Sequence, residues 1–302
     1  MYIQSVQKRQ LLNLKIVYKY AILFTMSAQK GSKLNQLERA LPEGLLVDAS
    51  WLERHGYYRS QRSQYVSAGW LEQPVRGVFC RPRGVVRWEQ VVISLQTLLE
   101  FPVSVGGRSA LELQGYAHYL PQSQKTIHLY CDKKLPAWVF KLDIEQAFIS
   151  HNRLRYLPEV ELSPQALSLT EHISESESLD GALRIDRWGQ WKWPLVMSMP
   201  ERAYLELLDE LPQKETFHMA DVIMEGLVNL SPRRMQPLLE ACKSVKVKRL
   251  FFFFAERHQH RWLAHIDHEK IDLGKGKRML VKGGKLDTKY QITVPEEFNG
   301  IQ

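Results

Sequence analysis

The chain has 302 residues, which is long for a single compact core and predicts about two domains. Hydrophobic residues make up 44% and charged residues 25%, so the composition excludes a disordered chain, a collagen and a multi-span membrane protein. The net charge of +8 is uneven: residues 1–87 hold 14 basic and 5 acidic residues, residues 88–243 hold 15 and 21, and residues 244–302 hold 12 and 7. This pattern favours a basic amino-terminal module joined to a different, mildly acidic domain.

The first 31 residues are expected to be a loosely ordered tail or the product of a start codon placed too far upstream. Segment 14–26 resembles the apolar part of a signal peptide, but Lys15 and Lys19 interrupt it and it is too short to span a bilayer. A polar sequence typical of a protein start begins at Met26. We therefore expect no export and no membrane association, and an amphipathic docking arm is the less favoured alternative.

The three cysteines, Cys80, Cys131 and Cys242, lie far apart in the sequence. Their spacing fits neither a zinc site nor a disulfide framework, and the number is odd. This usage is typical of a reduced, cytoplasmic protein in which cysteines serve as small buried hydrophobic residues.

Residues 32–84 are predicted to form a winged helix-turn-helix. The expected elements, in chain order, are a helix from Ser32 stopped by Pro42, a short extended piece over 45–47, a helix over 49–55 capped by Asp48 or Ser50, a helix from about Ser60 to Ala68, and a hairpin of strands 70–73 and 77–81. In a module of this order the second helix braces the third, and the third can enter a DNA major groove.

The third helix of this module carries the candidate DNA-reading side chains. Arginine pairs with guanine, glutamine with adenine and serine with either base or with phosphate, and no acidic residue lies among them. The candidates on the helix are Arg59, Ser60, Gln61, Arg62, Ser63, Gln64 and Ser67. Arg76 at the hairpin tip, with Arg81 and Arg83 after it, is expected to lie along the DNA backbone or minor groove. The alternative is a protein-docking module with a solvated basic face.

Two sequence motifs resemble a known family. The run from Leu45 to Pro82, LLVDASWLERHGYYRSQRSQYVSAGWLEQPVRGVFCRP, is similar to the amino-terminal winged-helix domain of AbiEi-type antitoxins. The run from Val105 to Leu120, VGGRSALELQGYAHYL, resembles the start of that family's second domain. The resemblance extends over most of the chain from about Ser32, and the two motifs together are more specific than the wing pattern alone.

The resemblance carries functional implications. AbiEi-type antitoxins are the antitoxin and transcriptional repressor half of the AbiE (type IV) toxin-antitoxin system of abortive infection, a phage defence. The resemblance therefore implies an autorepressor that binds inverted or direct repeats of double-stranded DNA in its own promoter, with two copies per operator. It also implies that the second domain is needed to neutralise a nucleotidyltransferase-like toxin.

Residues 83–87 are the expected linker, and residues 88–302 are expected to form a larger α+β domain, because strands come first and helices later. The expected elements are helices over 88–101 and 109–116, a strand over 125–130, short strands within 136–157, a hairpin of 183–187 and 191–196 turned at Gly189, and helices over 200–211, 219–230, 232–243 and 245–258. Residues 290–294 alternate again and are expected to return to the sheet.

No pattern of catalytic residues stands out in this second domain. Gly106 and Gly107 could begin a nucleotidyltransferase motif, but the next aspartate is Asp132 and no Asp-x-Asp follows. Asp186 with Gln190-x-Lys192 weakly resembles a nuclease motif, with a spacing too short for two strand positions. The alternative to a regulator is accordingly a metal-dependent nuclease that a winged helix targets to DNA.

Three other segments admit a structural and a functional interpretation. His258, His260, His265 and His268 cluster near a helix end, where solvated or partly buried groups are favoured over a metal site. The aromatic run 250–254 (LFFFF) is expected to be core rather than a platform for stacked bases. The basic, glycine-rich segment 274–285 fits a solvated loop and a phosphate contact equally well. We expect no enzyme activity, no cofactor and no metal site.

Overall fold

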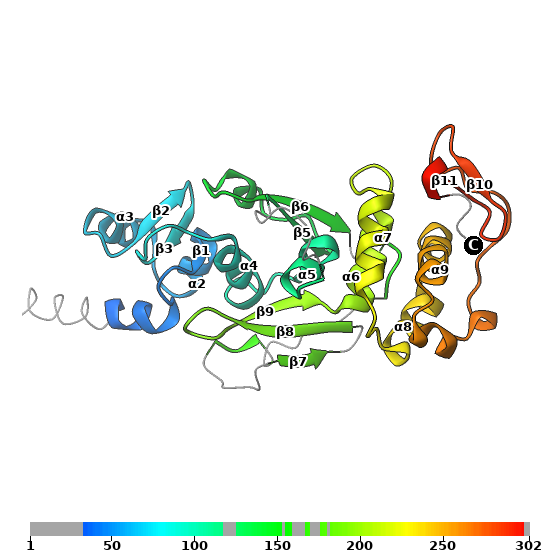
Figure 1. The fold of residues 1–302 in the computed structure, drawn as a ribbon. Helices are drawn as coiled ribbons and strands as arrows, with labels where there is room; N and C mark the ends of the chain where they lie inside the picture. Colours follow the sequence, from blue (N-terminus) through cyan, green and yellow to red (C-terminus); the bar gives the residue numbers. More distant parts are fainter. Residues whose placement is uncertain are drawn as a thin grey trace, which may run out of the picture.

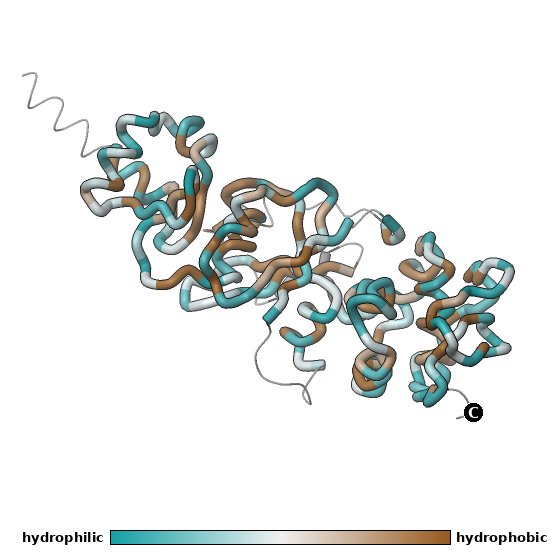
Figure 2. The backbone as a smooth tube through the Cα atoms, turned by 90° about the horizontal axis from the view of Figure 1, so that it is seen from above, coloured by the Kyte–Doolittle hydropathy of each residue, from teal (hydrophilic) through white to brown (hydrophobic). Residues whose placement is uncertain are grey.

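The structure is a computed structural model, and it describes residues 33–116, 125–152, 155–158, 167–169, 176–179 and 182–298. The predicted tail over 1–31 and the proposed cap at Ser32 lie outside these residues. Three parts follow one another along an elongated molecule: a small amino-terminal unit, a central sheet with its helices, and a helical group with a short hairpin (Figure 1). Hydrophobic segments recur in each part when the chain is viewed from above (Figure 2).

The amino-terminal unit has the predicted winged-helix order. Residues 33–40 are helical, and the elements that follow are β1 (Leu46–Asp48), α2 (Ala49–Arg54), α3 (Arg59–Ser67), β2 (Glu72–Val75) and β3 (Val78–Cys80). The three strands form an antiparallel sheet in the order β1-β3-β2. Gly77 has a φ of 82° in the turn between β2 and β3, a left-handed conformation that glycine adopts without steric cost.

Local sequence explains where α2 begins. The Asp48 carboxylate accepts a hydrogen bond of 2.7 Å from the Trp51 backbone N–H, so Asp48 rather than Ser50 caps the helix. Inside the unit, Leu37, Leu52 and Tyr65 are buried with the wing residue Phe79. These side chains join the helices to the three-stranded sheet.

The central part is built on a six-stranded mixed sheet in the order β6-β5-β4-β9-β8-β7. Its strands are β4 (Val103–Val105), β5 (Thr126–Cys131), β6 (Ala147–Asn152), β7 (Ser176–Leu179), β8 (Leu183–Trp188) and β9 (Trp193–Ser198). β4 pairs parallel with β9 and antiparallel with β5, and β5 pairs parallel with β6. Helices α4 (Trp88–Thr97) and α5 (Gly107–Leu113) pack against this sheet. The hairpin of β8 and β9, turned at Gly189, is as predicted.

A helical group follows the sheet, as the change in sequence period predicts. It consists of α6 (Pro200–Asp209), α7 (Phe217–Gly226), α8 (Pro232–Ala241) and α9 (Val245–His258). All four phenylalanines of the run 250–254 are buried on α9, so the core interpretation of that run is confirmed. In the described parts of the chain, no helix is long and apolar enough to cross a membrane.

The expectation that residues 290–294 return to the central sheet is wrong. β11 (Ile292–Val294) pairs antiparallel with β10 (Lys285–Asp287) in a separate two-stranded sheet. β11 packs on α9, which places the hairpin beyond the helical group and away from the six strands (Figure 1). Alternating hydrophobicity indicates a strand with one buried face but not which element covers that face.

Candidate nucleic-acid interface

Helix α3 has an inner face, which packs against the rest of the amino-terminal unit, and an outer face, which is exposed to solvent. Its inner face consists of Arg62, Tyr65 and the half-buried Val66, which helical spacing places together. The outward side chains are polar and uncharged or basic: Arg59, Ser60, Ser63, Gln64 and Ser67 are exposed, and Gln61 is half-buried. The structure thus brings six of the seven candidates on this helix onto its accessible side.

Arg62 is a correction to the set of candidate base-reading residues. It is only 7% exposed, and its Nη1 donates hydrogen bonds to the carbonyls of Ala49 (3.3 Å) and Tyr57 (3.1 Å). The same nitrogen forms an ion pair of 2.8 Å with Glu53 of α2. Because these contacts use the guanidinium inside the unit, Arg62 fixes α3 against α2 instead of reaching DNA.

The wing presents Arg76 at its tip. Arg76 is exposed in the turn between β2 and β3, and within the described residues the side chains of Arg76 and Arg59 form no ion pair. A cation that is free of intramolecular partners keeps its charge available for a phosphate. Of the candidate arginines, Arg59 and Arg76 are therefore the two whose charge is available for DNA.

Arg81 is a second correction, because it is engaged inside the protein. Its guanidinium donates to the carbonyls of Glu38 (3.2 Å) and Leu41 (3.3 Å) at the end of the first helix. It also forms an ion pair of 3.2 Å with Glu43. A cation at the carboxyl end of a helix satisfies free carbonyls and interacts favourably with the helix dipole, so the role of Arg81 is structural.

Arg83 is the third candidate whose surroundings differ from the prediction. Its guanidinium lies 5.3 Å from the ring centre of Trp191, in the turn between β8 and β9. The neighbouring Arg87 lies 5.3 Å from the ring centre of Trp188 in the same hairpin. The two linker arginines thus contact the central part of the molecule. Sequence spacing cannot reveal this contact, since more than one hundred residues separate the partners.

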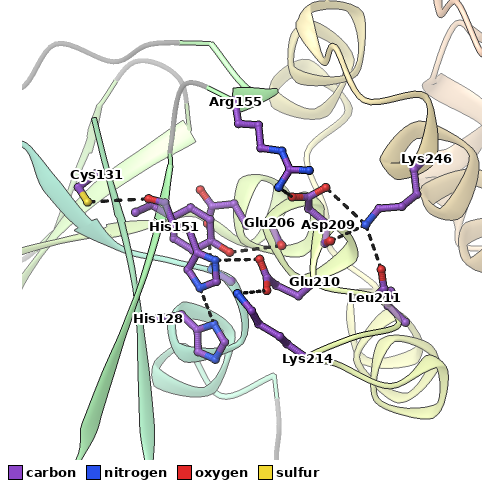
Figure 3. A network of polar contacts seen from close by, with 12 residues as sticks. His128, Cys131, His151, Arg155, Glu206, Asp209, Glu210, Leu211, Lys214 and Lys246 are labelled. Carbon is purple, nitrogen blue, oxygen red and sulfur yellow. Dashed lines mark hydrogen bonds and ion pairs between the residues drawn. The ribbon is translucent and has the colours of Figure 1, made fainter. Parts of the chain in front are cut away.

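A network of polar contacts occupies the junction of the central sheet with α6 (Figure 3). His128 on β5 and His151 on β6 stack with ring centres 5.1 Å apart, and His128 Nδ1 lies 3.1 Å from His151 Nε2. His151 Nδ1 lies 2.8 Å from Glu210, whose carboxylate also contacts Lys214 at 3.0 Å. Sequence analysis did not single out these residues, because they come from three distant segments.

Burial and neighbouring charges determine the pKa values of two residues in this network. Burial, and secondarily the charge of His151, lowers the pKa of His128 to about 4. Burial alone would raise the pKa of Glu210, but hydrogen bonds and charges from His151 and Lys214 lower it to about 2. Glu210 is therefore ionised and His128 neutral near pH 7.

Gly106 and Gly107 have a structural role beside this network. The Gly107 backbone N–H donates to the buried Glu206 carboxylate at 2.9 Å, and Glu206 also accepts from Arg202 at 2.9 Å and from Ser198 at 3.1 Å. A Cβ atom at position 106 would collide with Glu206 and with the ring of Tyr130. The glycine pair thus permits a close approach between β4, α5 and α6.

The candidate nuclease motif is not assembled. Asp186 lies on β8 opposite Leu195 and accepts a hydrogen bond of 2.7 Å from Arg184, whereas Lys192 lies in the hairpin turn. The histidines near the end of α9 use their ring nitrogens separately: His258 contacts Asp221 at 2.9 Å and His260 contacts the Met224 carbonyl at 2.7 Å, while their rings stack with centres 5.9 Å apart. Among the described ranges, no group of three or more histidine, cysteine or acidic side chains is arranged to hold a metal ion.

Comparisons with known proteins agree with this architecture. Residues 30–122 match the family described as "Transcriptional regulator, AbiEi antitoxin N-terminal domain". Residues 124–295 match the family described as "Transcriptional regulator, AbiEi antitoxin, Type IV TA system", and the two matches meet between α5 and β5. No curated protein matches the chain.

A solved structure shares the fold. The RV2827C protein from Mycobacterium tuberculosis superposes with a TM-score of 0.50 over 86% of this chain and 88% of that chain, at 17% sequence identity. At this identity the likeness concerns the fold alone. The family matches together extend over residues 30–122 and 124–295. The chain therefore belongs to the AbiEi family of transcriptional regulators, the antitoxins of type IV toxin-antitoxin systems.

Proposed function

We propose that this chain represses its own operon by binding double-stranded DNA through the winged helix, at inverted or direct repeats in the promoter. The observation that carries the proposal is the outer face of α3, where every exposed side chain is arginine, serine or glutamine. Such a face can approach phosphates without repulsion and offers hydrogen bonds to base edges. Arg62 and Tyr65 anchor the opposite face of the helix in the core, so the outer side chains project from a helix whose position is fixed.

The exposed residues divide into two roles under this proposal. Arg59 and Gln64 read base edges in the major groove, and Ser60, Ser63 and Ser67 add hydrogen bonds to bases or phosphates. Arg76, at the tip of the wing, contacts a phosphate of the DNA backbone. Gln61 is half-buried and contributes at the edge of the contact.

We propose that the chain works in two parts, a winged helix over 32–84 and an α+β domain over 88–302. The second part supplies the antitoxin function toward a nucleotidyltransferase-like toxin, and the chain acts in the cytoplasm without catalysing a reaction. The match of residues 124–295 to the AbiEi antitoxin family supports this assignment.

Duplex binding at several salt concentrations tests the proposal. The logarithm of the binding constant should fall linearly with the logarithm of the salt concentration, with a slope of roughly 0.9 for each phosphate contact. Arg76→Ala should lower that slope by about one contact, and Gln64→Ala should cost about 1–3 kcal/mol at one base pair. Binding that does not depend on salt would refute the proposal.

A second experiment separates the two parts. Arg59→Ala and Arg76→Ala in the full chain should relieve repression of a promoter reporter and leave protection from the co-encoded toxin intact. If these variants lose protection in proportion to repression, the division into two parts is wrong.

A further inference from the structure

Two exposed aromatic side chains flank helix α3. Tyr58 immediately precedes the helix and is 64% exposed, and Trp70 follows it and is 49% exposed. Tyrosine and tryptophan are enriched at binding surfaces, because each ring offers a large apolar area together with a hydrogen-bond donor. Neither residue was among the candidates that sequence analysis selected.

The backbone fixes the points from which both rings project. The Tyr58 carbonyl accepts the Arg62 backbone N–H at 3.0 Å, and the Trp70 backbone N–H donates to the Tyr65 carbonyl at 2.9 Å. Each ring also has an adjacent residue that is buried: Tyr57 is 2% exposed and donates to the Lys33 carbonyl, and Leu71 is 1% exposed. Because the adjacent residues anchor the chain, the backbone at both rings needs no ordering on binding.

The length of α3 matches the width of a DNA groove. Nine helical residues span about 14 Å at 1.5 Å per residue, and the B-DNA major groove is about 12 Å wide. A helix of this length that lies across the groove brings its two ends to the two phosphate walls. Side chains that flank the helix then meet the sugar-phosphate backbone, whereas the outer side chains within the helix face the bases.

Tyrosine and tryptophan suit this position chemically. The Tyr58 hydroxyl and the Trp70 indole N–H are both hydrogen-bond donors, and within the described residues neither group forms a hydrogen bond. A phosphate oxygen accepts from such groups, and the flat rings can cover the adjoining sugar. The donors carry no charge, so their contacts release no counterions.

We infer that Tyr58 and Trp70 are backbone-contacting residues that clamp α3 between the two phosphate walls of the major groove. The inference rests on the proposed DNA binding and adds a ligand for each ring, the sugar-phosphate backbone of a duplex. These contacts set the position of α3 in the groove and add affinity without base preference.

Two variants that remove the donor atoms and keep an aromatic ring test the inference; Tyr58→Phe removes the hydroxyl alone, and Trp70→Phe also replaces the indole with a smaller ring. Tyr58→Phe and Trp70→Phe should each weaken binding of the chain to a duplex of its own promoter about tenfold, the factor that corresponds to about 1.4 kcal/mol. Binding to an unrelated duplex of equal length should weaken by the same factor, and the salt slope should stay at the wild-type value. Loss of a basic contact would instead lower the slope.

Trp191→Phe is the matched control, since Trp191 is 57% exposed and lies in the hairpin turn of the central part. It should bind DNA as the wild-type chain does. Labelling the chain with 5-fluorotryptophan gives a second measurement. The two phenylalanine variants assign the fluorine resonances of Trp70 and Trp191, because each variant lacks one resonance. When the promoter duplex is added, the Trp70 resonance should shift and the Trp191 resonance should not.

The outcomes separate this inference from the proposed function. If Tyr58→Phe and Trp70→Phe both bind DNA as the wild type does, with the same salt dependence, and the Trp70 resonance does not shift, the inference about the two rings is wrong. The DNA-binding proposal is then unaffected. A change of the salt slope in either variant also contradicts the inference about the two rings. A wild-type chain that binds neither duplex overturns both.

Discussion

At the residue scale, the corrections concern arginines that sequence reasoning placed on DNA. Arginine has a long side chain with five donors, and it serves a phosphate and a set of backbone carbonyls equally well. In α3, the spacing of Arg62 relative to Tyr65 puts it on the inner face, and that spacing was the available signal. The partners of Arg81 lie about forty residues earlier in the chain, so only the three-dimensional structure identifies them.

The buried position of Arg62 leads to a prediction. Arg62→Ala should lower the free energy of unfolding by about 1–3 kcal/mol, because the carbonyls of Ala49 and Tyr57 lose their donor. Urea denaturation measures the effect, and Ser63→Ala on the exposed face is the control. At a temperature where Arg62→Ala remains folded, its base preference should equal that of the wild type. An altered base preference at unchanged stability would return Arg62 to the reading set.

The titration of His128 leads to a second prediction. The folded chain holds the pKa of His128 at about 4, below its ordinary value of 6.5, because the ring is buried beside His151. The unfolded chain therefore binds this proton first, and the free energy of unfolding should fall as the pH drops from 6.5 to 4, by at most about 3 kcal/mol from this residue. Glu210 acts in the same direction at lower pH: its folded pKa is about 2, so its contribution declines as the pH falls from 4.5 to about 2.

His128→Asn provides the comparison, since asparagine keeps an acceptor near His151 and does not titrate. Urea denaturation from pH 4 to 7 should show a smaller decrease in stability for the variant than for the wild type. Identical pH profiles would show that His128 is not the group responsible.

At the element scale, the sequence predicts helices and hairpins well where local residues decide them. The winged-helix order, the β8–β9 hairpin and the four helices from α6 to α9 each depend on caps, turns or apolar periods that are visible along the chain. β4 was not predicted, because Val103–Val105 is three residues long and shows no period. The pairing of β11 with β10 was also missed, since strand partners depend on contacts that periodicity does not contain.

The cap of α2 gives a prediction at this scale. The sequence left Asp48 and Ser50 as alternatives, and only Asp48 accepts a hydrogen bond from a free N–H of the first turn, at 2.7 Å from Trp51. Asp48→Ala should cost about 1 kcal/mol of stability, within a range of roughly 0.5–2 kcal/mol. Ser50→Ala changes an exposed residue two positions later and should change stability by less than about 0.5 kcal/mol. Chemical denaturation of both variants measures the difference, and equal losses would contradict the assignment of the cap.

At the scale of the whole molecule, segment charges do not translate directly into surface charges. Residues 88–243 are acidic in composition, yet several of their carboxylates are nearly buried and paired with cations, four of them on or beside α6. The pairs are Glu201 with Arg234, Glu206 with Arg202, Asp209 with Lys246, and Glu210 with Lys214. Two of these pairs, Glu201 with Arg234 and Asp209 with Lys246, join α6 to α8 and α9. The basic charge that the amino-terminal segment exposes is likewise reduced, because Arg62 and Arg81 form ion pairs with Glu53 and Glu43.

The linker arginines join the parts of the molecule and give the last prediction. The Leu46 backbone N–H donates to Ser94 of α4 at 2.8 Å, and Arg83 and Arg87 lie over Trp191 and Trp188. An exposed cation–π contact contributes about 0.5–1 kcal/mol, so a double-mutant cycle of Arg83→Ala and Trp191→Ala should yield a coupling energy of that size. Lys192→Ala in the same turn is the control and should show no coupling with Arg83→Ala.

Because Arg83 is engaged with Trp191, Arg83→Ala should also leave the salt slope of duplex binding unchanged, whereas Arg76→Ala should lower it by about 0.9. Additive effects in the cycle, together with a reduced slope for Arg83→Ala, would mean that Arg83 leaves the indole and contacts phosphate when DNA binds.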